Sequence, residues 1–170
     1  MSKTKGIVML RKLLGLKPKA SIYSQAMPQT EGALELTYLG TAGFILKNKQ
    51  RTVVLDPYLS RVGVTELFRP LHTNTALLKK YIPHADDVLI GHAHYDHILD
   101  APDLCKQTGA RLIGSKATCM VGRAAGLPES QLKETEGRED IACGSWTVRG
   151  LPSIHGKAIF GRIPIAGDIL

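Results

Sequence analysis

The chain has 170 residues, of which 44% are hydrophobic and 22% are charged, and these values are ordinary for one soluble globular domain. Six of the seven surplus positive charges lie in residues 1–20, whereas residues 31–170 hold 16 basic and 15 acidic residues. The nearly neutral remainder gives no indication of a nucleic-acid partner. No stretch approaches the roughly 20 apolar residues that an integral membrane segment needs.

Residues 1–30 are interpreted as a basic leader followed by a linker. The leader mixes lysine and arginine with apolar residues, a pattern typical of a short amphipathic helix on a membrane or partner, or of a solvated leader that packs loosely on the domain. Basic residues interrupt its apolar run and no small-residue cleavage pattern follows, so a signal peptide is not indicated. Residues 31–170 are expected to form the domain.

The cysteines indicate a reducing compartment. Cys105, Cys119 and Cys143 are odd in number and lack a CxxC spacing. They therefore indicate neither a disulfide framework nor a zinc ribbon, and the cytoplasm is the simplest location.

The first half of the domain is expected to be mostly strand. Three short runs rich in β-branched and aromatic residues, LELTYLG, AGFILKN and RTVVLDP, each end in Gly, Asn or Pro. They predict an antiparallel meander, with a turn of small residues at Gly40–Gly43 between the first two strands.

After Pro57, strands and helices are expected to alternate. Asp100 is the predicted N-cap of one of the helices. The predicted elements are a helix near Thr75–Tyr81, a buried strand at Asp87–Gly91, a helix over Asp100–Gly109, a strand at Ala110–Ile113, a helix from about Ser115 to Ala125, an acidic polar stretch at Glu129–Asp140 and a strand at Trp146–Gly150.

The stretch GHAHYDHILD, residues 91–100, holds three of the six histidines of the chain and an aspartate within six positions. His92 and His94 point the same way in an extended segment, and the following turn can bring Asp96 and His97 to a second position nearby. One loop can then serve two divalent metal ions, since imidazole nitrogen suits zinc and a carboxylate can bind a metal or act as a base. The alternative is three exposed histidines beside a helix cap, without a metal.

The GHAHYDH motif after a buried strand resembles the signature of the metallo-β-lactamase superfamily of metal-dependent hydrolases. The segment ELTYLGTAGFILKNKQRTVVLDPYLS resembles the opening hairpin of its lactonase-like and phospholipase-like branch, the group similar to ascorbate-6-phosphate lactonase. The similarity runs from about Glu35 to His155. It implies an α+β fold, the four-layer αββα sandwich, of which this chain would hold the N-terminal half to two thirds.

The resemblance also implies one or two zinc ions, with manganese or iron(II) as possible replacements. The implied ligands are His92, His94 and His155 for a first metal ion, and Asp96 and His97 for a second. A structural role is the alternative for His155, whereas His72 and His84 are expected to be exposed and to bind no metal.

Asp56, in VVLDPYLS, matches an acidic position of the family at the end of a strand, below the metal site. It would accept a hydrogen bond from a ligand imidazole, and a turn-forming Asp-Pro pair is the alternative.

The second half of the family fold would supply a bridging acid and a last histidine. No histidine follows His155, and Gly167-Asp168 resembles the glycine-aspartate ligand motif only superficially, because Pro164 interrupts the strand expected before it. The chain is therefore expected to be C-terminally incomplete.

These inferences predict a metal-dependent hydrolase that uses a metal-bound hydroxide on an ester, lactone, amide or phosphodiester bond of a small-molecule substrate. Asp96 is the predicted catalytic residue, which orients the attacking water. The alternative is a catalytically incomplete fragment that acts at most as a metal-binding or interaction module. An incomplete sandwich would leave an apolar sheet face uncovered, which favours a dimer through that face.

Overall fold

The computed structural model describes residues 34–152. The leader and linker over residues 1–30, the predicted ligand His155 and the weakly matching Asp168 lie outside these described residues, so the predictions for them stay predictions.

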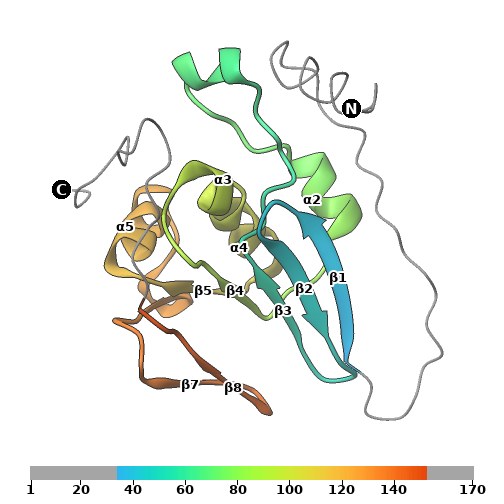
Figure 1. The fold of residues 1–170 in the computed structure, drawn as a ribbon, viewed down its shortest axis with the longest axis vertical. Helices are drawn as coiled ribbons and strands as arrows, with labels where there is room; N and C mark the ends of the chain where they lie inside the picture. The colour runs from blue at the N-terminus through green and yellow to red at the C-terminus, as the bar shows by residue number, and fades with distance from the viewer. Residues whose placement is uncertain (1–33, 153–170) are drawn as a thin grey trace, which may run out of the picture.

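A six-stranded mixed sheet is the largest element of the fold (Figure 1). Its strands, in spatial as well as chain order, are β1 (Glu35–Gly40), β2 (Gly43–Lys47), β3 (Thr52–Leu55), β4 (Asp87–Leu89), β5 (Arg111–Gly114) and β6 (Leu132–Glu134). The first three strands pair antiparallel, and β3 to β6 run parallel. The predicted meander is therefore confirmed, whereas β6 was not predicted.

Helices cover one face of this sheet (Figure 1). They are α2 (Thr75–Tyr81), α3 (Tyr95–Ile98), α4 (Ala101–Thr108) and α5 (Lys116–Ala124). The described range also holds two short 3₁₀ helices, η1 (Val64–Phe68) and η2 (Glu129–Gln131). Val54, Val88 and Leu112 of three neighbouring strands are fully buried against the helix side chains, among them Leu78 of α2 and Leu104 of α4. The three longer helices fall where the sequence predicted them, and α3 is an additional single turn.

A two-stranded antiparallel sheet, β7 (Asp140–Cys143) and β8 (Trp146–Arg149), lies on the other face. Successive side chains of a strand point to opposite faces. For this reason Leu112 of β5 packs toward the helices, whereas the next residue, Ile113, packs with Ile141 and Cys143. The described residues thus form three layers, helices, sheet and second sheet, and the predicted α+β class is confirmed.

The part of the same face that β1 and β2 form is exposed in residues 34–152. Leu36 and Tyr38 of β1 are 61% and 56% exposed, and they pair across the hairpin with Leu46 and Phe44. A dimer through an uncovered sheet face would need such an apolar surface, and that dimer stays a prediction.

A buried carboxylate links three strands at the edge of the sheet where β4 begins. Asp87 is fully buried, and Arg51 donates to its Oδ2 from Nε and Nη2 at 2.9 and 2.6 Å. Arg111 donates from Nε to Oδ1 of Asp87 at 2.7 Å and from Nη2 to the carbonyl of Ala142 in β7 at 2.8 Å. The network therefore ties the central strands to each other and to the second sheet.

None of the helices in the described range is both long and apolar enough to cross a bilayer.

Replacing Asp87 by alanine should lower the free energy of unfolding by about 3 kcal/mol, because two partly buried guanidinium groups lose their carboxylate partner. Denaturant unfolding measures this loss. The matched control is Asp103→Ala, which removes only an exposed pair with Lys106 at 3.5 Å and should cost less than about 1 kcal/mol. Equal losses in the two variants would contradict the role assigned to Asp87.

Candidate metal centre

The candidate site lies at the edge of the sheet where the parallel strands end. Asp56 follows β3 directly, and the loop with the histidines follows β4, which runs parallel to β3. Since parallel strands end at the same edge of a sheet, the two segments meet although 35 positions separate Asp56 from Gly91. The turn between β1 and β2 reaches the same edge, because Phe44 at the start of β2 pairs with Leu55 at the end of β3.

Asp56 connects the two strand ends. Its Oδ1 accepts a hydrogen bond from the amide of Gly91 at 2.7 Å, and its Oδ2 lies 2.9 Å from Nδ1 of His97. The side chains of Asp56 and His97 are only 13% and 14% exposed. Because an ionised carboxylate only accepts hydrogen bonds, Nδ1 of His97 is the donor in this contact, and Nε2 is the ring nitrogen that could bind a metal ion. This is the contact that the role predicted for Asp56 requires, and a plain Asp-Pro turn would not need it.

The backbone conformation of Asp56 also indicates a functional position. Its φ is +39°, in the left-handed region that residues other than glycine rarely adopt. Such strain persists where surrounding contacts fix it, and it is concentrated at functional sites.

The histidine rings of the loop lie against one another. The ring centroids of His92 and His94 are 4.7 Å apart, and those of His92 and His97 are 3.9 Å apart. Oδ2 of Asp96 lies 3.9 Å from Nε2 of His97. The structure therefore brings together four of the five predicted ligands, and their imidazole and carboxylate donors suit a transition-metal ion.

The described side chains supply only part of a coordination shell. Within residues 34–152, no group of three or more His, Cys, Asp and Glu side chains is arranged to hold a metal ion. The predicted set that joins His92 and His94 to His155 includes a residue outside this range, so this ligand set stays a prediction.

Asp100 holds the loop that contains Leu59 and Ser60. Its Oδ2 accepts hydrogen bonds from the amides of Leu59 and Ser60 at 2.6 and 2.8 Å, and its Oδ1 accepts one from Oγ of Ser60 at 2.5 Å. Burial raises the pKa of Asp100, and these three hydrogen bonds oppose the rise. Asp100 occupies the N-cap position of α4 as predicted, but its side chain makes no hydrogen bond to that helix. The N-cap prediction is therefore confirmed, and the carboxylate binds the preceding loop in place of the helix.

Two tyrosines pack beside the histidine loop. The rings of Tyr58 and Tyr95 meet edge to face with centroids 6.1 Å apart, and Tyr58 is only 6% exposed. Burial raises the pKa of Tyr58 to about 12, so its phenol stays protonated at neutral pH and accepts a hydrogen bond from the amide of Val62 at 3.0 Å. Tyr58 is therefore a buried, neutral side chain that packs against Tyr95, a contact that no motif in the sequence indicated.

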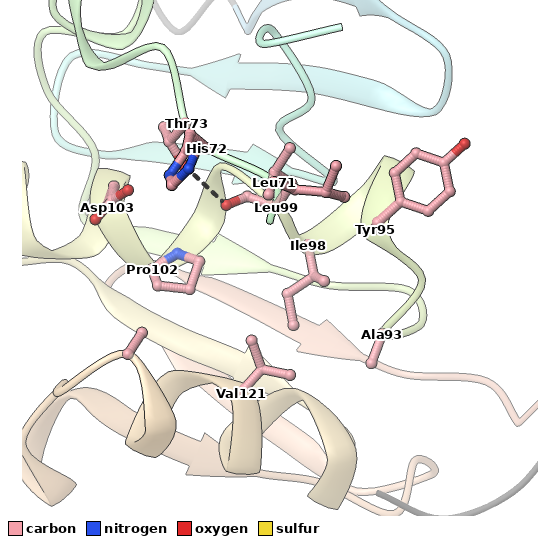
Figure 2. Close-up of a pocket in the computed structure, with 11 residues that line it drawn as sticks. Leu71, His72, Thr73, Ala93, Tyr95, Ile98, Leu99, Pro102, Asp103 and Val121 are labelled. Atoms are coloured by element: carbon pink, nitrogen blue, oxygen red, sulfur yellow. Dashed lines mark hydrogen bonds between the residues drawn. The ribbon is translucent and has the colours of Figure 1, made fainter. Parts of the chain in front are cut away.

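The histidine loop lines part of a cavity of about 360 Å³ (Figure 2). Ala93 and Tyr95, which alternate with His92 and His94 along the chain, line part of it. The other lining residues are Leu71, His72, Thr73, Ile98, Leu99, Pro102, Asp103, Val121 and Ala125. The cavity is therefore mainly apolar and adjoins the candidate metal centre through one shared segment.

The two remaining histidines of the described range are exposed, as expected. His72 lies at the polar side of the cavity, and His84, whose side chain is 65% exposed, has its Nε2 3.4 Å from Oδ2 of Asp86.

Comparison with protein families identifies the fold. The family model described as the beta-lactamase superfamily domain matches residues 51–169. The chain belongs to this superfamily. The resemblance to metallo-β-lactamases drawn from the GHAHYDH motif is thereby confirmed, whereas the assignment to a lactonase-like branch stays a prediction.

Relatives within the superfamily are longer than this chain. A UPF0173 metal-dependent hydrolase of Thermodesulfovibrio yellowstonii is 33% identical over 138 residues, which are 75% of this chain and 48% of that protein. A second one, of Anaeromyxobacter sp. (strain K), is 36% identical over 101 residues, which are 59% of this chain and 34% of that protein. The chain thus spans about half the length, or less, of these relatives.

A solved structure also shares the superfamily fold. A mutant of CmlA beta-hydroxylase aligns with a TM-score of 0.54 and 22% identity, over 92% of this chain and 31% of that chain. This likeness concerns the fold alone.

Substituting Asp56 by asparagine should weaken zinc binding by about 10- to 100-fold. Asparagine tolerates the left-handed backbone and can still accept from Gly91, but its amide group donates toward Nδ1 of His97 and places the imidazole proton on Nε2. Titration calorimetry with zinc measures the change.

The matched control for this substitution is Asp86→Asn, which alters a carboxylate beside the exposed His84 and should leave zinc affinity unchanged. Asp56→Asn protein that binds zinc as tightly as the unsubstituted chain would rule out the proposed link between Asp56 and the metal.

Proposed function

We propose that this chain carries the metal-binding loop of a metal-dependent hydrolase that acts on an ester, lactone or phosphodiester bond of a small molecule. The observation that carries the proposal is the hydrogen-bonded pair of Asp56 and His97 inside a cluster of three histidines and an aspartate. The names of the two relatives, both metal-dependent hydrolases, support it.

The residues have distinct proposed roles. His92 and His94, with His155, would hold one cation, and Asp96 and His97 would hold a second one. When bound, a cation supplies Lewis-acid activation of water and of the scissile carbonyl or phosphoryl group. Zinc suits this imidazole-rich donor set, and manganese or iron(II) can replace it.

The residues of the chain itself orient the reactants. Asp96 is 38% exposed, so its carboxylate can accept a hydrogen bond from the attacking water and orient it. Asp56 binds Nδ1 of His97, so that Nε2 on the other side of the ring points away from the Asp56 carboxylate. Asp100 binds the amides of Leu59 and Ser60, and this fixes the neighbouring Tyr58, whose ring packs against Tyr95.

A second candidate function is a metal-binding or interaction module without catalysis. It is favoured by the partial coordination shell within residues 34–152. The two candidates differ in turnover, because both bind metal and only the first hydrolyses a substrate.

We also propose a cytoplasmic location. Cys105, Cys119 and Cys143 are buried free thiols, which suits a reducing compartment.

The substitution His94→Ala should abolish metal uptake by the 170-residue chain and any hydrolysis of a chromogenic lactone or phosphodiester, because it removes an imidazole from the cluster. Plasma emission spectroscopy measures the metal content. The control His84→Ala changes an exposed histidine and should retain both metal and turnover. Unchanged metal content in His94→Ala protein would refute the assignment, and metal uptake without any turnover in the unsubstituted chain would favour the non-catalytic module.

A further inference from the structure

Arg61 is a half-buried arginine without a carboxylate partner in the described range. Three arginines of residues 34–152 are half-buried, Arg51, Arg61 and Arg111. Arg51 and Arg111 both bind Asp87, at 2.6 and 2.7 Å. Among the described residues, no aspartate or glutamate lies within ion-pair distance of Arg61.

Neutral groups fix the guanidinium of Arg61. Its Nη2 donates to the carbonyl of Leu39 at 2.8 Å, and its Nη1 donates to Oγ1 of Thr41. The guanidinium carbon lies 5.4 Å from the centre of the Tyr58 ring, a cation–π contact. These contacts occupy two of the five N–H groups of a guanidinium, and none of the three partners carries a negative charge.

The groups that hold Arg61 contact Asp56 and the histidine loop. A Cβ added to Gly43 would lie 2.9 Å from the carbonyl oxygen of Asp56 and 3.2 Å from that of Gly40, so the turn bound by Arg61 packs directly on Asp56. The Tyr58 ring beneath the guanidinium contacts the ring of Tyr95, which stands between His94 and Asp96 in the chain.

Backbone strain is concentrated at the same place. Four described residues other than glycine have a positive φ, and three of them are Thr41 at +55°, Asp56 at +39° and Arg61 at +49°. Strain of about 1–3 kcal/mol at each such residue is typical of functional sites, where the surrounding contacts impose it.

We propose that Arg61 binds an anionic group of the substrate, a carboxylate or a phosphate, beside the scissile bond. The inference rests on the proposed hydrolase function and narrows its substrate class to anionic esters or lactones. A fixed guanidinium and a bound cation repel each other, and an anionic group of the substrate between them would be attracted by both. The planar guanidinium also matches the oxygen geometry of carboxylates and phosphates.

The competing explanation is that Arg61 only holds the turn between β1 and β2. Holding a turn needs hydrogen-bond donors and no charge, so a neutral amide could replace the guanidinium. Anion binding needs the charge, and this difference determines the choice of variants.

The test compares two esters on the metal-loaded 170-residue chain, neutral 4-nitrophenyl acetate and the anionic mono-4-nitrophenyl ester of succinate. Arg61→Gln keeps an amide donor and removes the charge, and it should raise KM for the anionic ester about 10- to 100-fold while changing kcat/KM for the neutral ester less than about twofold. Arg61→Lys keeps the charge, so its KM for the anionic ester should lie between that of the unsubstituted chain and that of Arg61→Gln. The control Arg123→Gln removes an exposed arginine paired with Glu129 and should change the kinetics of neither ester.

A binding measurement separates this inference from the hydrolase proposal. Titration calorimetry of the metal-loaded chain with inorganic phosphate and, separately, with succinate should show weaker binding in Arg61→Gln than in the unsubstituted protein. Of phosphate and succinate, the anion whose affinity falls more in Arg61→Gln is the one that Arg61 prefers. If neither ester is hydrolysed but anion binding depends on Arg61, the hydrolase proposal fails and the anion site stands.

The inference itself is overturned by either of two results. One is a fall in turnover of equal size for both esters in Arg61→Gln, which assigns Arg61 to holding the turn. The other is KM and anion binding that are the same in Arg61→Gln and in the unsubstituted chain.

Discussion

The carboxylate of Asp56 accepts the amide of Gly91 at 2.7 Å and faces Nδ1 of His97 at 2.9 Å, and the arrangement of the candidate site depends on this pair of contacts. The first contact joins the end of β3 to the start of the histidine loop, and the second fixes the ring at the other end of that loop. A single acidic side chain therefore sets both the position of the loop and the proton of one imidazole. The strained backbone at Asp56 is consistent with a position that several contacts determine together.

The two edges of the sheet carry carboxylates with different partners. At one edge Asp87 is neutralised by Arg51 and Arg111, which is a closed electrostatic network that links strands. At the other edge Asp56 faces an imidazole whose second nitrogen can bind a cation, and Arg61 lacks a carboxylate among residues 34–152. The first edge thus stabilises the layers, whereas the second edge brings together an imidazole that can bind a cation and a guanidinium that can bind an anion.

Much of this architecture could be predicted from local patterns. The apolar runs predicted β1 to β5, β8 and three helices but not β7, and the spacing of the histidines predicted a cluster after a buried strand. Strand β6 was missed because Leu132–Glu134 holds one apolar residue, and only its pairing with β5 makes it a strand. The contacts of Asp100 and Arg61 were missed for a related reason. Their partners lie 41 and 22 positions away in the chain, at Leu59 and Leu39, so no local pattern reports them.

The central claim is that the imidazoles of the loop bind a cation in an arrangement fixed by Asp56. Anomalous diffraction at the zinc absorption edge, from crystals of the 170-residue chain grown with zinc, tests it most directly. The account predicts a zinc peak about 2.0–2.1 Å from ring nitrogens of His92 and His94, with Nδ1 of His97 still bound to Asp56. A zinc peak elsewhere, or none at the loop, would contradict it.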